Sequence, residues 1–469
     1  MPLTSMPTPP PAGAAAVALI LAAGQGTRMR SRLPKVLHPV CGRPMLAYVV
    51  DAATAATGGK PWVVVSPAVE AAVREAVGPL VCLAVQPEQL GTGDALRVGL
   101  AQVAPAVEEV VVASGDAPLI TPATLERLLA ARASADAAMA LATMEPDDPG
   151  GYGRVVRDDE GPLRIVEEKD AAAGELALGE VVGGAYAFDA AWLRTALERL
   201  GASPATGEVY LTGLVALARA DGRAVVAVEV EDDLELAGIN DRVQLATVEA
   251  DLRWRILETH MLAGVTMQDP TTVYVEAGVQ LARDVVLAPN VILRGTTAVG
   301  EGSVIGAGSQ LIDSRVGAGC RVWASVLESS EVEDGATVGP FAHLRPGASV
   351  GKGAEVGNFA ELKQARLGAR SKQHHMSYLG DTTTGEGVNV GAGTITANYD
   401  GRRKHRTTIG DGAFLGVDTM LVAPVTVGAA ARTGAGAVVT RDVPPGKLAV
   451  GVPARIREPR PRPEDPETT

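Results

Sequence analysis

The sequence predicts an α/β protein in which a doubly wound, mostly parallel sheet is followed by a connector helix and a left-handed parallel β-helix of hexapeptide repeats. Three observations predict it. Short β-branched runs alternate with helix-like stretches in the first half, one long charged segment with helical periodicity lies near the middle, and an aliphatic residue recurs at every sixth position in the second half. The expected boundaries are a disordered leader 1–15, a first domain 16–240, the connector helix 241–263, the β-helix 264–456 and a disordered tail 457–469.

The first half reads as a parallel sheet. Its clearest strands are the aliphatic runs Val17–Leu21, Trp62–Ser66 and Val110–Ser114, each bounded by Gly or Pro, and helix-forming stretches such as Thr124–Ala133 separate them. In sheets of this kind ligands bind at the carboxyl ends of the strands. The loops that follow the strands are therefore the first places to look for a site.

The second half repeats with a period of six. After the helical segment Asp241–Leu262, two runs of hexads carry a small or aliphatic residue in one phase: Val332, Val338, Leu344, Val350, Val356 and Leu362, and then Ile409, Leu415, Leu421, Val427, Thr433 and Val439. One inward aliphatic and one small turn residue per hexad predict a triangular β-helix, in which each hexad forms one side. The phase is lost through Lys363–His405, where we expect a longer loop to leave the helix.

Composition excludes several classes of function. The chain has 469 residues and a formal net charge of -13, and only 3% of its residues are aromatic, so neither a basic face for duplexes nor a stacking platform for single strands is expected. Its three cysteines are far apart, which predicts neither disulfides nor a zinc site. The apolar run near the N-terminus is too short to span a bilayer. We expect a soluble, cytoplasmic protein with no nucleic-acid partner.

A candidate phosphate site follows the first strand. The segment Leu21–Met29 contains Gly24 and Gly26, which let backbone N–H groups approach a phosphate chain, and Arg28 and Lys35 add cations able to neutralise a triphosphate. A simple strand-to-helix turn is the alternative interpretation.

A candidate metal site lies at the end of another strand. Asp116 follows the run Val110–Ser114, and Asn240 offers a second oxygen; Mg²⁺ takes one or two such protein ligands and leaves its other positions to water and phosphate. The alternative is that Asp116 caps a helix beginning near Pro118.

These residues belong to an ordered series of motifs. LAAGQGTRM, LPKVL, QPEQLGTGDA, SGDAPL, GYGR, IVEEKD and GIN resemble those of the sugar-nucleotide pyrophosphorylase domain, a Rossmann-like nucleotidyltransferase. With the hexapeptide domain behind it, the chain resembles the bacterial bifunctional N-acetylglucosamine-1-phosphate uridyltransferase/glucosamine-1-phosphate acetyltransferase family.

The resemblance implies roles for residues of the first domain. Lys35 and Arg28 act on the phosphates, and Asp116 and Asn240 hold Mg²⁺. The nucleotide and sugar contacts that it implies are Leu21, Ala22, Ala23, Gly24, Gln86, Gly91, Thr92, Ser114, Gly115, Gly153 and Glu167. Among them, Gln86, Gly91 and Thr92 would recognise the uracil ring, and Gly153 and Glu167 would contact the sugar. Two residues depart from the family pattern: Val182 replaces an Asn that contacts the sugar, and Ser114 replaces a Tyr.

A second site is expected in the interrupted part of the hexads, where His374 and His375 stand among Lys, Tyr and Asn residues. Acyl transfer to an amine needs a base that titrates near the working pH, and histidine suits this role; a solvated pair of loop residues is the alternative. The resemblance makes His375 the base. It also implies that Arg345, Lys363, Tyr378, Asn389 and Lys404 bind the sugar phosphate, and that Ala392, Asn398, Tyr399 and Ala435 lie along acetyl-CoA.

This second site also departs from the family. Val417 replaces a Ser that faces the thioester, and a C-terminal Arg that reaches CoA is absent from its position, with Arg455 close by. The basic run Arg402–Arg406 is either a solvated loop or a phosphate contact. Since related acyltransferases place the CoA site between neighbouring β-helices, we expect a homotrimer.

The leading hypothesis is a bifunctional enzyme of cell-wall precursor synthesis. Acetyl-CoA and glucosamine-1-phosphate would give N-acetylglucosamine-1-phosphate, which UTP would convert to UDP-N-acetylglucosamine. Two alternatives remain at this point: a single-activity nucleotidyltransferase whose β-helix only assembles the trimer, and a non-catalytic trimeric scaffold.

Overall fold

The structure is a computed structural model that describes residues 16–204 and 206–458. The chain forms two compact units, and the boundary between them, after Leu252, falls within the 21-residue helix α8 (Arg242–Leu262). Helix α8 occupies the stretch expected as a connector. The Asp241 carboxylate caps it, because Oδ1 accepts hydrogen bonds of 2.9 Å from the amides two and three residues later. The expected disordered leader, and the expected tail beyond residue 458, lie outside the described residues.

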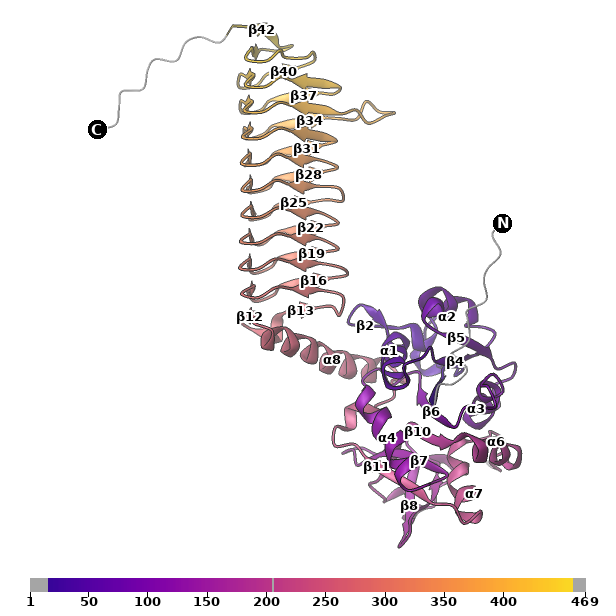
Figure 1. Ribbon diagram of the computed structural model, residues 1–469. Coiled ribbons are helices and arrows are strands. Elements are labelled where there is room, and N and C mark those ends of the chain that lie inside the picture. Colours follow the sequence, from indigo (N-terminus) through magenta and orange to yellow (C-terminus); the bar gives the residue numbers. More distant parts are fainter. Residues whose placement is uncertain (1–15, 205, 459–469) are drawn as a thin grey trace. The chain divides into compact units, whose positions relative to one another are not determined.

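The first unit is built on a nine-stranded sheet with the main order β11-β7-β10-β6-β1-β4-β5, to which the hairpin β8–β9 is attached through β10 (Figure 1). The strands are β1 (Ala16–Leu21), β4 (Trp62–Val65), β5 (Cys82–Val85), β6 (Glu109–Ser114), β7 (Met139–Met144), β8 (Arg154–Asp158), β9 (Gly161–Val166), β10 (Val181–Asp189) and β11 (Val225–Glu229). Strand β1 is parallel to β4 and β6, β4 to β5 and β7 to β11, whereas β10 runs antiparallel to β6 and β7. The predicted mostly parallel sheet is confirmed.

Helices cover both faces of this sheet. Alternate side chains of β1 enter different core clusters, Ala18 and Ile20 on one face and Val17 and Leu19 on the other. The first cluster includes residues of α1 (Met45–Thr57), α2 (Glu70–Val77) and α4 (Pro122–Ser134); the second includes residues of α3 (Thr92–Leu100), α6 (Ala190–Arg199) and α7 (Leu214–Ala220). A short helix, α5 (Ala173–Leu176), follows β9. The sheet is therefore doubly wound, as predicted.

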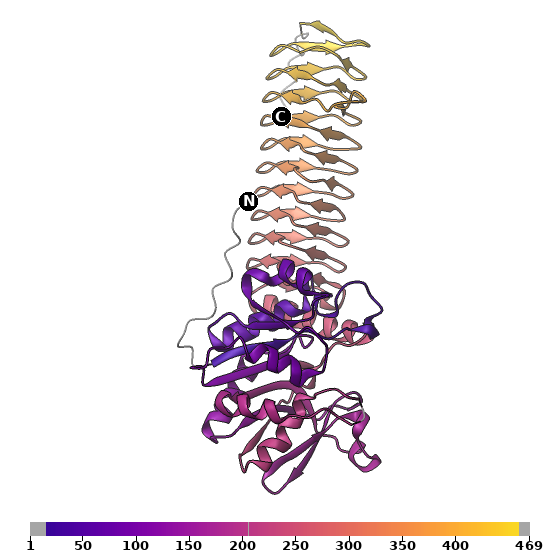
Figure 2. The same cartoon turned by 90° about the vertical axis from the view of Figure 1, so that its right-hand side faces the viewer.

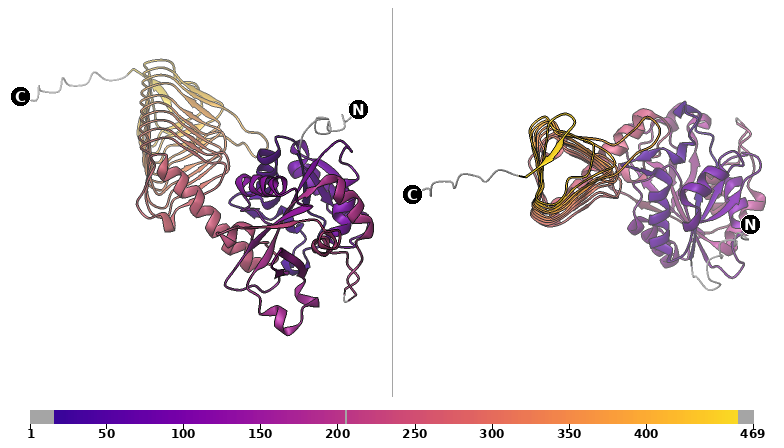
Figure 3. Two further views of the ribbon diagram at one scale, coloured as in Figure 1. Left: turned by 60° about the horizontal axis from the view of Figure 1, so that its bottom comes forward. Right: turned by 90° about the horizontal axis from the view of Figure 1, so that it is seen from above.

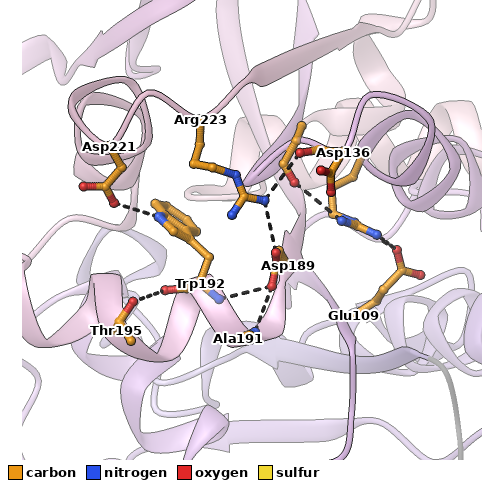
Figure 4. A network of polar contacts seen from close by, with 10 residues as sticks. Glu109, Asp136, Asp189, Ala191, Trp192, Thr195, Asp221 and Arg223 are labelled. Atoms are coloured by element: carbon orange, nitrogen blue, oxygen red, sulfur yellow. Dashed lines mark hydrogen bonds and ion pairs between the residues drawn. The ribbon is translucent and has the colours of Figure 1, made fainter.

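A polar network fixes the end of the sheet where β6 begins and β10 ends (Figure 4). Asp189 caps α6 by accepting hydrogen bonds from the amides of Ala191 and Trp192, and it also accepts one of 3.1 Å from Arg223. Burial by itself raises the pKa of Asp189, but these donors outweigh it and lower the pKa. The opposite end of β6, at Ser114, is left for the candidate site.

The second unit is a parallel β-helix that runs from β12 (Thr266–Met267) to β42 (Arg455–Arg457) (Figure 2). It has three sheets of 12, 10 and 9 strands, which begin at β12, β13 (Tyr274–Val275) and β14 (Gln280–Leu281). From β12 to β37 (Met420–Val422), each strand pairs in parallel with the strand three places later in the chain, for example β13 with β16 (Ile292–Arg294). Seen along its axis, the coil is triangular (Figure 3). The predicted β-helix is confirmed.

The inward residues of the two predicted hexad runs are all buried, from Val332, 1% exposed, to Val439, also 1% exposed. Between the runs a loop does leave the coil, as expected, but it is much shorter than the interval Lys363–His405. Six strands, β28 (Glu361–Lys363), β29 (Arg366–Leu367), β30 (Lys372–Gln373), β31 (Tyr378–Gly380), β32 (Thr382–Thr384) and β33 (Asn389–Val390), continue the coil, and β34 (Ile395–Ala397) follows them.

Two features of this interval make the six-residue repeat hard to recognise in the sequence. Some inward positions carry polar residues, since Gln373, Thr384 and Thr396 are at most 3% exposed. Other steps between inward residues contain five residues rather than six, as from Leu362 to Leu367. Only residues 398–406, before β35 (Thr407–Ile409), leave the coil, and they protrude beside β34 in Figure 1.

Close contact between successive coils requires glycine at some of the corners. A Cβ atom placed on Gly368 would lie 2.0 Å from the carbonyl oxygen of Gly385 in the next coil, so no side chain fits there. The last strand, β42, differs from the others because it turns back and pairs antiparallel with β41 (Leu448–Val450). In the described part of the chain, no helix combines the length and apolar character needed to cross a bilayer.

Candidate active sites

A cavity of about 510 Å³ opens where β1 and β6 end. Its walls come from five segments far apart in the sequence, and the candidate residues that line it are Leu21, Ala23, Gly24, Arg28, Lys35, Gln86, Gly91, Thr92, Ser114, Asp116 and Asn240. Two other candidates lie behind the wall: Ala22 donates to the carbonyl of Val64 on β4, and Gly115 donates to the carbonyl of Leu21. The cavity lies at the carboxyl ends of parallel strands, where the sequence predicted a site.

Lys35 stands at the centre of the charged part of this cavity. Its ammonium group forms an ion pair with Asp116 and donates a hydrogen bond of 2.8 Å to Oδ1 of Asn240, which also accepts one of 2.9 Å from Arg28. Gly26 makes this position possible, since a Cβ atom on Gly26 would lie 2.5 Å from Cβ of Lys35. Its φ of 62° is also one that glycine adopts readily.

The alternative that Asp116 caps a helix is wrong. Helix α4 begins at Pro122, and its cap is Thr121, whose hydroxyl accepts from the amide of Thr124. Asp116 instead faces the cavity, and its backbone carbonyl accepts from the amide of Ile239, which brings Asn240 beside it. The pairing of distant residues around one cavity also argues against a simple strand-to-helix turn at Gly24.

The oxygens of Asp116 and Asn240 both contact the Lys35 ammonium, so they converge on one position that a cation occupies. One carboxylate and one amide oxygen, facing a cavity with room for phosphate and water, match the donor set that Mg²⁺ prefers. Within residues 16–204 and 206–458 no group of three or more His, Cys, Asp or Glu residues is placed to hold a metal ion.

The far end of the cavity holds the residues expected to recognise the base. Gln86 is buried after β5, and Gly91 has a φ of 113° with Val209 packed so closely that a Cβ atom would lie 2.5 Å from the Val209 carbonyl oxygen. Thr92 accepts a hydrogen bond from the amide of Leu211. Gln89, Ala95 and Glu208 also line the cavity but were not among the predicted residues, although Gln89 and Ala95 lie in or beside the motif QPEQLGTGDA.

The two candidate sugar contacts lie together but do not line this cavity, and Glu167 lines another cavity of about 280 Å³. Oε1 of Glu167 accepts a hydrogen bond of 2.6 Å from Thr212, and it lies 3.6 Å from the position of a Cβ atom on Gly153. Burial raises the pKa of Glu167, although the Thr212 hydrogen bond opposes the change. Val182 is 6% exposed and packs beside Gly153, so an apolar side chain occupies the place of the expected Asn.

On the β-helix, His375 begins a column of candidate residues along one corner. The amide of Gly393 donates to the carbonyl of His375, that of Asp418 to Ala392, and that of Gly436 to Val417. Ala435 adjoins the last of these, so His375, Ala392, Val417 and Ala435 occupy the same corner of four successive coils. The structure therefore aligns the predicted base with three of the residues expected along CoA or the thioester.

The cationic candidates gather on the neighbouring sheet. Contact with the Lys404 side chain, and then the positive charges of Lys404 and Arg345, lower the pKa of Lys363. Arg345 donates a hydrogen bond of 2.9 Å to Glu361, and the hydroxyl of Tyr378 lies over Gly380 close to Asn398. Such a cluster of like charges is suited to a phosphate group. Asn389 lies apart from it, on β33, where it pairs with Lys372.

Lys404 reaches the cluster because the loop 398–406 is ordered. Tyr399 and Lys404 form an antiparallel bridge, and Asp400 accepts hydrogen bonds from the amides of Arg402 and Arg403 and contacts His405. These donors, with the Arg403 amide first, lower the pKa of Asp400 to about 2. The backbone of the basic run is thus held as a hairpin, while Arg402, Arg403 and Arg406 are exposed, as in the solvated-loop interpretation. Arg455 lies on β42 and is exposed.

The chain is similar to known proteins along most of its length. Residues 18–199 match the model of the MobA-like NTP transferase domain. The bifunctional protein GlmU of Heliobacterium modesticaldum is 47% identical over 434 residues, which are 92% of this chain and 94% of that protein. The GlmU of Kineococcus radiotolerans is 48% identical (95% and 91%), and that of Pelotomaculum thermopropionicum is 50% identical (87% and 89%). The chain belongs to the GlmU family of bifunctional enzymes, with a nucleotidyltransferase domain ahead of its β-helix.

Proposed function

We propose that this bifunctional enzyme divides its two transfers between its two units. The β-helix transfers acetyl from acetyl-CoA to the amine of glucosamine-1-phosphate, and the first unit then transfers uridylyl from UTP to the product. The observation that carries the proposal is the convergence of Lys35, Asp116 and Asn240 on one position beside the phosphate loop. A scaffold without activity has no use for three such groups, so the non-catalytic alternative is set aside.

In the uridylyl transfer, a phosphate oxygen of the sugar phosphate attacks the α-phosphorus of UTP and pyrophosphate leaves. Lys35 and Arg28 hold the phosphates and stabilise the negative charge that builds on their oxygens. Asp116 and Asn240 would hold Mg²⁺, which supplies further charge neutralisation when it is bound. The space beside Gly24 is open, since no atom beyond its chain neighbours lies within 4 Å of the position of a Cβ atom, and this leaves room for a phosphate group.

In the acetyl transfer, the amine nitrogen attacks the thioester carbonyl, a C–N bond forms and the C–S bond breaks. His375 takes the proton that the amine loses, and the CoA thiolate takes a proton as it leaves. Arg345, Lys363 and Lys404 hold the phosphate of the sugar. Val417 carries no hydroxyl, so this chain performs the step without a side-chain donor at that position.

We further propose that the enzyme is a homotrimer whose acetyl-transfer sites lie between neighbouring β-helices. Phe341 and Phe359 support this, since their rings stack 5.4 Å apart and are 58% and 60% exposed on the corner that carries His375. Met376, next to His375, is 72% exposed. Exposed apolar side chains that form one continuous strip are typical of an interface. Light scattering of the full chain tests this state, and a monomer at micromolar concentration contradicts it.

A paired assay tests the proposed function. Thiol release is measured with acetyl-CoA and glucosamine-1-phosphate, and pyrophosphate release is measured with UTP and N-acetylglucosamine-1-phosphate. We expect both products, the second only with Mg²⁺ present. No thiol above background at any pH would mean that the β-helix serves only assembly.

A variant of Glu167 tests the sugar side of the first site. Glu167→Gln is expected to lower kcat/KM for N-acetylglucosamine-1-phosphate about tenfold, because a charged hydrogen-bond acceptor becomes neutral.

Since burial raises the pKa of Glu167 in the folded state, its ionised form costs folding free energy at high pH. The same variant should therefore raise Tm at pH 8, and this gain should disappear as the pH falls below the ordinary glutamate value. Calorimetry at both pH values checks it, and a lower Tm at pH 8 contradicts it.

A further inference from the structure

The side-chain amide of Gln86 is fixed by hydrogen bonds from its nitrogen atom. Its nitrogen Nε2 donates a hydrogen bond of 2.8 Å to Oδ2 of Asp94 and another of 3.3 Å to the carbonyl oxygen of Gly91. Gln86 is 2% exposed, and it lines the nucleotide cavity. Both N–H bonds of the amide are thereby used. Across residues 16–204 and 206–458 no donor is bonded to Oε1, and this oxygen is left for a ligand in the cavity.

Asp94 fixes which end of the amide faces the cavity. Its other oxygen, Oδ1, accepts a hydrogen bond of 2.9 Å from Arg97 one helical turn later, so the whole carboxylate acts as an acceptor. The Gly91 carbonyl is an acceptor as well. If the Gln86 amide turned over, Oε1 would face two acceptor oxygens without a proton between them. A buried mismatch of this kind is unfavourable, so only one orientation is accessible.

We propose that Asp94 is a positioning residue for nucleobase specificity: by holding the Gln86 amide, it presents a hydrogen-bond acceptor to the base and thereby selects uracil over cytosine. This inference rests on the proposed contact between Gln86 and the base. Asp94 reaches the substrate only through Gln86, and it lies in the turn of α3 that follows Gly91.

The two bases differ in the hydrogen-bonding group at N3, and this difference explains the selection. Uracil has an N–H donor at N3, which can bond to Oε1 of Gln86. Cytosine has a lone pair at N3, so the same oxygen would meet a second acceptor. A site built around a buried hydrogen bond rejects a partner that cannot complete it, because the polar groups of the site are then left unpaired.

The test compares UTP and CTP in competition in one reaction, with the full-length enzyme and N-acetylglucosamine-1-phosphate. The ratio of the two UDP- and CDP-sugar products does not depend on the fraction of enzyme that is folded. Asp94→Asn nearly preserves the shape of the side chain but supplies a donor, which allows the Gln86 amide to turn over. We expect the preference for UTP to fall about tenfold or more.

Controls separate this inference from the function on which it rests. Asp51→Asn, at an exposed carboxylate paired with Arg43, should keep the preference of the wild type, and Gln86→Ala should lose most of it. If Gln86→Ala keeps the preference, the contact of Gln86 with the base is wrong and the inference falls with it. If Gln86→Ala loses the preference and Asp94→Asn keeps it within about twofold, the role of Asp94 alone is overturned.

Discussion

Asp116→Ala is expected to lower pyrophosphate release from UTP by about a thousandfold or more, while thiol release from acetyl-CoA stays at the wild-type rate. The variant removes the only carboxylate of the proposed metal pair and leaves Lys35 beside Asn240 without its ion-pair partner. In the proposed function the two reactions occur in different units, so the second should not respond. Both rates are measured on the same preparation.

A matched control is available on α1. Asp51→Ala removes a carboxylate of the same unit that is half exposed and paired with Arg43, and it should leave both rates unchanged. Loss of both activities in Asp116→Ala would indicate that the variant is misfolded or that the assignment of two separate sites is wrong. Rates near those of the wild type would remove Asp116 from the reaction.

His375→Ala is expected to lower thiol release by about a hundredfold to ten-thousandfold, the usual contribution of a general base, with no change in pyrophosphate release. The neighbouring residue is the control. His374 is tied to Glu355, with 3.2 Å between Nε2 and Oε2, and His374→Ala should retain most of the activity. If the two variants behave the other way round, the base is His374 and the alignment of the corner column needs another explanation.

Local pattern predicted most of the fold. The β-branched runs gave the strands β1, β4 and β6, and the hexads gave the buried core of the β-helix, because both signals depend on neighbours in the sequence. The coil between Leu362 and Ile409 escaped prediction for the same reason. Its inward positions hold Gln373, Thr384 and Thr396, whose burial depends on partners in adjacent coils rather than on their own hydrophobicity.

The sequence predicted those residues of the site that belong to recognisable motifs. Lys35 and Asn240 are more than two hundred residues apart, and only their shared resemblance to a family linked them before the structure placed both beside Asp116. The orientation of the Gln86 amide could not be predicted, since it follows from a tertiary contact with Asp94. The hydrogen bond from Thr212 to Glu167 could not be predicted either, because Thr212 lies in a segment without a motif of its own.

The reversed last strand has a consequence for how copies of the chain meet. A parallel β-helix ends in a row of unpaired backbone groups, and such an edge is a template on which the first coil of another molecule can add. In the largest sheet β42 covers that edge antiparallel to β41, and it presents Arg455 and Arg457 to solvent. The antiparallel direction of β42 and the positive charges of its two arginines therefore oppose the growth of end-to-end fibres. Copies of the chain are expected to associate through the sides of the β-helix instead.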